Sequence, residues 1–195
     1  LWAATGTPVR IVLLIMMLMA VWCIYVAVER TIALAKARKQ SRLLAEAVAG
    51  PLSEANSGEA LAVCLKEEFE NAYLGHMLVG GLKEFNARPD KYGIEAVERA
   101  LDRVTITESQ ALRKGMNMLA TTGATAPFVG LVGTIFGIIN AFQMMEKEGA
   151  TITDLAPAIG EALITTAIGI IVAIVGVWLF NFFTARIEAI TNKMS

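Results

Sequence analysis

Three side chains in the last third of the chain place polar chemistry inside apolar sequence. Thr134 lies in the run GMNMLATTGATAPFVGLVGTIFGIINAF, and Glu161 and Thr166 lie in the run LAPAIGEALITTAIGIIVAIVGVWLFNFF. Glu161 is the only ionisable side chain well inside either run. A carboxylate at membrane depth is costly, so such residues usually face a cavity, a partner or an ion path. We expect a functional role for Glu161; the alternative is a Glu satisfied by Ser, Thr or backbone groups at a helix contact.

A transmembrane helical hairpin is the element that must position these groups. Each run offers about 20 or more residues, enough to cross a hydrocarbon core of roughly 30 Å. Because the two helices are antiparallel, we expect both threonine hydroxyls roughly 14 Å below one membrane face, with Glu161 roughly 7 Å nearer that face. A threonine cannot titrate near neutral pH, so the pair can order water or bind a carboxylate but cannot carry the proton itself.

Small residues recur every three or four positions along both runs. Such a stripe lets helix backbones approach closely, which is a main source of helix association in lipid. Tight packing within one chain is the simplest explanation for any single glycine. We predict a packing role for the glycines at Gly130, Gly133, Gly137 and Gly169.

The strings GATAPFVGLVGTIFGI and LAPAIGEALITTAIG resemble the second and third membrane helices of the ExbB/TolQ/MotA proton-channel family, and they are most similar to its ExbB and TolQ branch. The resemblance implies that Thr134 and Thr166 are pore-lining threonines and that Glu161 is the family's membrane glutamate. Phe136 stands where ExbB and TolQ commonly show Trp, a departure that changes no charge.

The resemblance also implies an assembly. It would be a ring-shaped homo-oligomer, a pentamer, around a dimer of a single-span ExbD- or TolR-like subunit bound in the central pore. The proton carrier would then be an Asp of that partner, and proton passage would drive a relative rotation that delivers force across the periplasm. The recipient would be TonB-like in ExbB-type systems and TolA-like in TolQ-type systems. Membrane lipids complete the expected partners; we expect no nucleic acid, cofactor or metal.

Residues 11–28 form a third apolar run that is long enough for one span. Its length, its aromatic residues near one end and the lack of a small-residue cleavage site favour a retained anchor over a signal peptide. Of the 17 lysines and arginines, all but Arg10 and Lys147 lie between the first two apolar runs or after the last. The positive-inside rule therefore predicts a periplasmic N-terminus and a cytoplasmic central region and C-terminus, in a bacterial inner membrane.

The central region is helical in pattern. Arg30 to Ala49 is rich in good helix formers, so we expect it to continue the first membrane helix until Gly50-Pro51 breaks it. The apolar stripe from Ile94 to Leu112 meets no Pro or obvious stop, which predicts one continuous helix running into the second span.

No catalytic or metal-binding constellation is visible in the sequence. There is no glycine loop followed by Lys-Ser or Lys-Thr to hold a nucleotide. His76 is the only histidine, which favours a packed or surface residue over a metal ligand. Cys23 and Cys64 are expected to be free thiols, because one lies in a span and the other in a reducing compartment. We therefore expect no enzyme.

These observations predict an all-α membrane protein with three transmembrane helices and long cytoplasmic helical extensions. Because the chain opens with Leu1 rather than Met, we also expect it to be part of a longer translated product. The predicted segments are a periplasmic N-terminus at 1–8, membrane helices at 9–28, 116–142 and 155–183, a cytoplasmic helical domain at 29–115, a periplasmic turn at 143–154 and a cytoplasmic C-terminal helix at 184–195.

The predicted function is a proton-channel subunit that couples proton motive force to mechanical work across the periplasm. Two alternatives stay open: a three-span gliding-motility stator subunit, and a membrane scaffold without transport. The scaffold leaves Glu161 at membrane depth with no task. The conducted ion could also be Na⁺, although no cluster of oxygen ligands argues for it.

Overall fold

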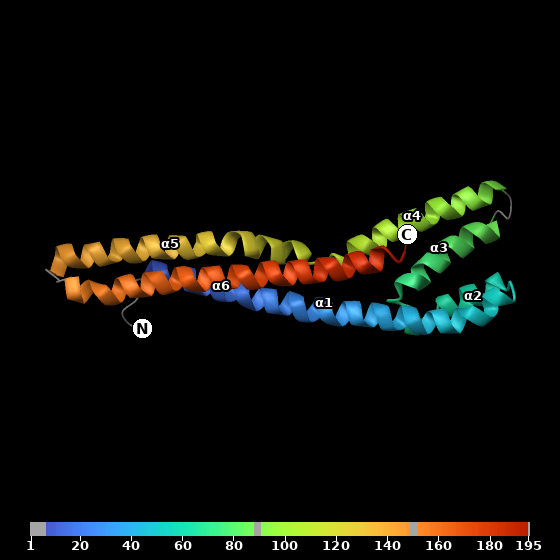
Figure 1. The fold of residues 1–195 in the computed structure, drawn as a ribbon, viewed down its shortest axis with the longest axis horizontal. Coiled ribbons are helices and arrows are strands. Elements are labelled where there is room, and N and C mark those ends of the chain that lie inside the picture. The colour runs from blue at the N-terminus through green and yellow to red at the C-terminus, as the bar shows by residue number, and fades with distance from the viewer. Residues whose placement is uncertain (1–6, 88–90, 149–151, 195) are drawn as a thin grey trace. The chain divides into compact units, whose positions relative to one another are not determined.

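The computed structural model describes residues 7–87, 91–148 and 152–194 (Figure 1). Three of the helices in these residues are long and apolar enough to cross a membrane: α1, α5 and α6. The chain is thus an all-α protein with three candidate membrane-spanning helices, as predicted. The helices are α1 (Thr7–Ser53), α2 (Ser57–Cys64), α3 (Tyr73–Ala87), α4 (Lys91–Leu112), α5 (Met116–Glu148) and α6 (Ile152–Thr191), with a short 3-10 helix, η1 (Glu67–Phe69), between α2 and α3.

The three apolar helices are longer than a bilayer requires. They contain 47, 33 and 40 residues, whereas about 20 are enough to cross the hydrocarbon core. Helix ends therefore do not mark the membrane faces, and the predicted limits of the three spans stay predictions. The predicted N-terminus and outer turn lie partly outside the described residues, since 1–6 and 149–151 are not described.

The chain divides into two compact units. The first, here called the membrane unit, comprises Leu1–Ala27 and Gly115–Phe182; the second, here called the polar unit, comprises Val28–Lys114 and Phe183–Ser195. Because α1 contributes to both units as one helix, the expected continuation of the first apolar run is confirmed. The helix ends at Ser53, slightly later than predicted, and Pro51 lies inside its last turn.

Within the polar unit, α1, α2, η1 and the residue before α3 form a small apolar core, made of Leu44, Val48, Cys64, Phe69 and Ala72. Leu78 and Val79 of α3 pack against it. α3 packs in turn on α4, where a Cβ added at Gly81 would lie 3.4 Å from the side chain of Leu101. α1 and α3 are also joined by a polar contact, because the backbone amide of Asn71, just before α3, donates to the Gln40 side chain at 2.9 Å.

α4 and α5 are separate helices, so the predicted continuous helix is wrong. α4 ends at Leu112 and α5 begins at Met116. The physical cause is Gly115, whose φ of +79° lies in the left-handed region that glycine adopts at little cost. The apolar periodicity missed the break because a lone glycine in a helical pattern is an ambiguous signal.

Within the membrane unit, α5 and α6 run antiparallel and meet backbone to backbone (Figure 1). A Cβ added at Gly169 would lie 2.7 Å from the carbonyl oxygen of Ala126, and one at Gly176 would lie 3.1 Å from the amide nitrogen of Gly123. We call this contact the α5–α6 seam. Side chains larger than glycine are therefore excluded from much of it.

Candidate functional site

The hydroxyl groups of Thr134 on α5 and Thr166 on α6 are hydrogen-bonded to each other across the α5–α6 seam. The Thr166 hydroxyl also lies 3.0 Å from the carbonyl oxygen of Gly130. The Thr134 hydroxyl lies 3.3 Å from the carbonyl oxygens of Gly130 and Ala162. Both threonines are partly buried. The structure thus brings together the two threonines that the sequence analysis placed at one depth.

Gly130 makes this contact possible in two ways. A Cβ at this position would lie 3.1 Å from Cα of Thr166 and 3.2 Å from the carbonyl oxygen of Thr165, so a larger residue would push the helices apart. The same residue offers its backbone carbonyl to the Thr166 hydroxyl. Gly137 and Gly169 lie along the same seam, where a Cβ on Gly137 would lie 2.6 Å from Cβ of Ala162.

The chemistry open to the threonine pair follows from its hydrogen bonds. Each hydroxyl has one proton and two lone pairs. One of the two protons lies in the hydrogen bond between the hydroxyls, and the other can go to a backbone carbonyl of α5 or α6. Lone pairs remain that can accept from a water molecule or from a protonated carboxyl. The pair is therefore suited to order a proton-bearing group, whereas a hydroxyl cannot release a proton near neutral pH.

Glu161 lies on a different face of α6 from Thr166. Their five-position separation is about 140° around an α-helix. Glu161 lines an apolar groove of about 450 Å³ between α1 and α6, together with Val9, Leu13, Met16, Met17, Ala20, Ile164, Thr165, Ile168 and Val172. The predicted site residues therefore occupy two places, the threonine pair in the α5–α6 seam and Glu161 in the groove beside α1.

Thr165 is a buried polar residue that the sequence analysis did not select. It is 1% exposed, and its hydroxyl donates to the backbone carbonyl of Glu161 at 2.9 Å. Its methyl carbon fills the space of the missing side chain at Gly133, where a Cβ would lie 2.4 Å from it and 3.0 Å from Val12 on α1. Gly133 thus faces both α6 and α1. The Thr165-Thr166 doublet was the only signal in the sequence, and it does not reveal which hydroxyl faces α5.

Outside the membrane unit, His76 on α3 pairs with Glu108 on α4. His76 Nδ1 lies 2.7 Å from Oε1 of Glu108. The hydrogen bond to this carboxylate raises the pKa of His76, and partial burial of the ring opposes that rise. Cys23 and Cys64 are both buried and free, as predicted. Across 7–87, 91–148 and 152–194, no cluster of three His, Cys, Asp or Glu residues could hold a metal ion.

Comparison with known proteins finds one matching family and several relatives. The sequence model of the "MotA/TolQ/ExbB proton channel family" matches residues 69–195. A biopolymer transport protein ExbB from Xanthomonas campestris is 49% identical over 115 residues, which cover 58% of this chain and 44% of the relative. A Tol-Pal system protein TolQ from Pseudomonas aeruginosa is 39% identical over 120 residues, covering 58% of this chain and 52% of the relative.

A third relative aligns along nearly the whole chain. It is a biopolymer transport protein ExbB from Neisseria meningitidis, 32% identical over 203 aligned positions that cover 97% of this chain and 89% of the relative. By contrast, the chain aligns with less than half of the Xanthomonas protein and about half of the Pseudomonas protein.

Proposed function

Because this chain belongs to the MotA/TolQ/ExbB proton channel family, we propose that it is a channel-forming, non-enzymatic subunit of an energy-transducing motor in the bacterial inner membrane. The motor couples proton motive force to mechanical work across the periplasm through a single-span ExbD- or TolR-like partner. Relatives named ExbB and TolQ both match the chain, which supports a TonB-like or a TolA-like protein as the recipient of the force.

The observation that carries this proposal is the hydrogen-bonded pair of Thr134 and Thr166 inside an apolar helix hairpin. Three helices of one copy are too few to enclose a wide polar path. Copies of the hairpin are therefore proposed to form a ring, a pentamer by resemblance to the family, that presents one threonine pair per copy to a central pore. The mobile proton needs a titratable carrier there, which we assign to a carboxylate on the partner's membrane helix.

Glu161 enters the proposal separately from the threonine pair. The residue lines the groove beside α1, and a charge among apolar side chains at membrane depth is costly. We propose that a proton moving between the outer face and the pore is bound and released by this carboxylate. This step is separate from the one at the threonine pair. The role is tested by Glu161→Gln, which keeps the size of the side chain and removes its ionisation.

The experiment is proton flux into vesicles that contain this protein together with the single-span subunit encoded beside it. The test variant combines Thr134→Val with Thr166→Val, which keeps shape and removes both hydroxyls. The matched control is Thr125→Val, because Thr125 lies exposed on the same helix and donates only to the Thr121 carbonyl, at 2.8 Å.

We expect the double variant to assemble and to lose at least about 90% of the flux, since removing one well-placed polar group commonly costs a factor of ten or more. The control should conduct as the wild type does. A double variant that assembles and conducts normally would remove the threonines from the ion path. If no complex conducts, even with the downstream protein supplied, the scaffold alternative is favoured.

A further inference from the structure

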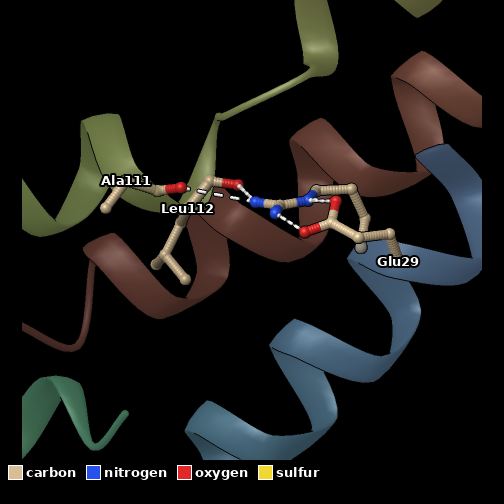
Figure 2. A network of polar contacts seen from close by, with 4 residues as sticks. Glu29, Ala111 and Leu112 are labelled. Carbon is tan, nitrogen blue, oxygen red and sulfur yellow. Dashed lines mark hydrogen bonds and ion pairs between the residues drawn. The ribbon is translucent and has the colours of Figure 1, made fainter. Parts of the chain in front are cut away.

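Arg30 on α1 is a buried charge in the polar unit. It is 5% exposed. On one side, its Nε donates to Oε2 of Glu29 at 2.6 Å, and its Nη2 donates to Oε1 of the same carboxylate. On the other side, its Nη1 donates to the backbone carbonyls of Ala111 at 3.3 Å and Leu112 at 3.2 Å (Figure 2). We call this set of contacts the Arg30 clasp.

The clasp meets α4 where that helix ends. The last carbonyls of an α-helix have no partner within the helix, and a cation at this end also interacts favourably with the helix dipole. Here the amide of Lys114 donates to the Ala111 carbonyl at 3.2 Å, after which Gly115 turns the backbone into the left-handed region. Arg30 adds a second donor for the Ala111 carbonyl and a donor for the Leu112 carbonyl.

The clasp links the end of α4 to a helix that is not interrupted. A continuous helix transmits force through its ladder of backbone hydrogen bonds, and this ladder is interrupted between Leu112 and Met116. α1, in contrast, is unbroken over 47 residues. By tying the end of α4 to α1, Arg30 gives the interrupted element a fixed anchor on a continuous one.

Glu29 holds the guanidinium in the required orientation. Bidentate contact with a carboxylate fixes the plane of an arginine side chain. Figure 2 shows the Glu29 carboxylate on one side of the guanidinium and the Ala111 and Leu112 carbonyls on the other. A buried charge without such partners would be strongly unfavourable. The Arg30 guanidinium therefore depends on the Glu29 carboxylate and on the two backbone carbonyls together.

We propose that Arg30 is a positioning residue of the channel: its clasp fixes the C-terminal turn of α4 to α1, and conduction requires this turn to be held. The functional half of this inference rests on the proposed function. The structural half, the fixing of the turn, does not, and the experiment reads the two separately.

The experiment compares Arg30→Ala with Arg42→Ala in the complex assembled with the single-span subunit. Arg42 is the matched control, because it lies on the same helix with its side chain 84% exposed and pairs with Glu46 at 3.5 Å. Hydrogen–deuterium exchange of peptides covering residues 109–118 reports on the turn, and proton flux per assembled complex reports on conduction.

We expect Arg30→Ala to speed exchange in residues 109–118 by about tenfold and to lower flux by a similar factor, whereas Arg42→Ala changes neither. Arg30→Lys should lie in between, because an ammonium keeps the charge but cannot bridge a carboxylate and two carbonyls in one plane. Unchanged exchange in Arg30→Ala overturns the clasp. Faster exchange with normal flux overturns the positioning role.

Two further outcomes are distinguishable. If Arg30→Ala does not assemble, Glu29→Gln replaces it, since this variant keeps the arginine and removes only the negative charge that pairs with it and orients it. Failure of that variant to assemble as well would make the clasp a requirement of folding and would overturn the inference. If the wild type itself does not conduct, the proposed function fails, while the exchange measurement still decides whether Arg30 holds the turn.

Discussion

Four threonine hydroxyls in the membrane unit find acceptors on their own helix or on the neighbouring one. Thr125 and Thr165 each donate to the carbonyl one turn earlier, whereas Thr134 and Thr166 bond across two helices. Backbone carbonyls are the available acceptors at membrane depth, where water is scarce. The cross-helix pair is therefore the arrangement in which an approaching polar group can compete for hydroxyls on both helices at once.

Sequence reasoning placed these two threonines at one depth, but it predicted neither the hydrogen bond between them nor the face on which Glu161 lies. Depth follows from the rise of about 1.5 Å per residue and needs no knowledge of packing. The face depends on how α6 is rotated, which the seam glycines determine by closing α6 onto α5. The spacing of about 140° between Glu161 and Thr166 can be read from the sequence. Which neighbouring helix each of them faces cannot, so the groove between α1 and α6 could not be foreseen.

The ion pair of His76 with Glu108 gives a prediction at the scale of one residue. The raised pKa of His76 means that the pair stabilises the fold fully below the unfolded pKa of about 6.5 and less as pH rises through the raised value. Glu108→Gln should therefore lower the pKa of His76, which as the only histidine gives a single imidazole signal in NMR titration.

The variant should also destabilise the protein more near pH 6 than near pH 9. Glu70 acts on the same imidazole and moderates the change. Glu95→Gln is the control, since Glu95 lies on the same helix and pairs with Arg99 instead. An imidazole pKa that is the same in Glu108→Gln and in the wild type would contradict the assignment.

At the scale of helices, the seam predicts opposite outcomes for two glycines of α6. A Cβ on Gly169 would lie 2.7 Å from the Ala126 carbonyl oxygen, whereas nothing lies within 4 Å of one on Gly160. Gly169→Ala should lower stability by about 1–3 kcal/mol through overpacking. Gly160→Ala should be neutral or slightly stabilising, because alanine is the better helix former.

Thermal unfolding of the two purified variants in the same detergent measures this difference. Both substitutions add one methyl group to the same helix, so the change in composition cannot account for a difference between their melting temperatures. Equal melting temperatures would show that the helices separate enough to admit a Cβ, contrary to the seam described here. The small-residue stripe alone predicted close packing; the distances that separate these two glycines came only from the structure.

At the scale of the whole molecule, the distribution of charge predicts an N-out, C-in topology that thiol labelling can test. Glu146 and Glu98 are both exposed, and the native Cys23 and Cys64 are buried, which keeps the background low. In intact spheroplasts, an impermeant maleimide should label Glu146→Cys near the end of α5. It should reach Glu98→Cys on α4 only after the membrane is permeabilised.

The reverse pattern of labelling would place the polar unit outside the cell and would overturn the predicted orientation. Glu46→Cys, on the part of α1 that belongs to the polar unit, provides an independent check. It should respond as Glu98→Cys does.

The α5–α6 seam has a consequence for how this sequence can change over evolutionary time. Large apolar residues of the hairpin, such as Ile135, Ile171 and Ile174, are exposed on the chain, while the seam consists largely of backbone. Exposed positions can drift among Ile, Leu, Val and Phe wherever they meet lipid, because lipid does not discriminate among such side chains as a packed core does. At Gly169 and Gly176, a single added carbon meets backbone. The positions of this membrane hairpin that have no side chain are therefore among its least replaceable ones.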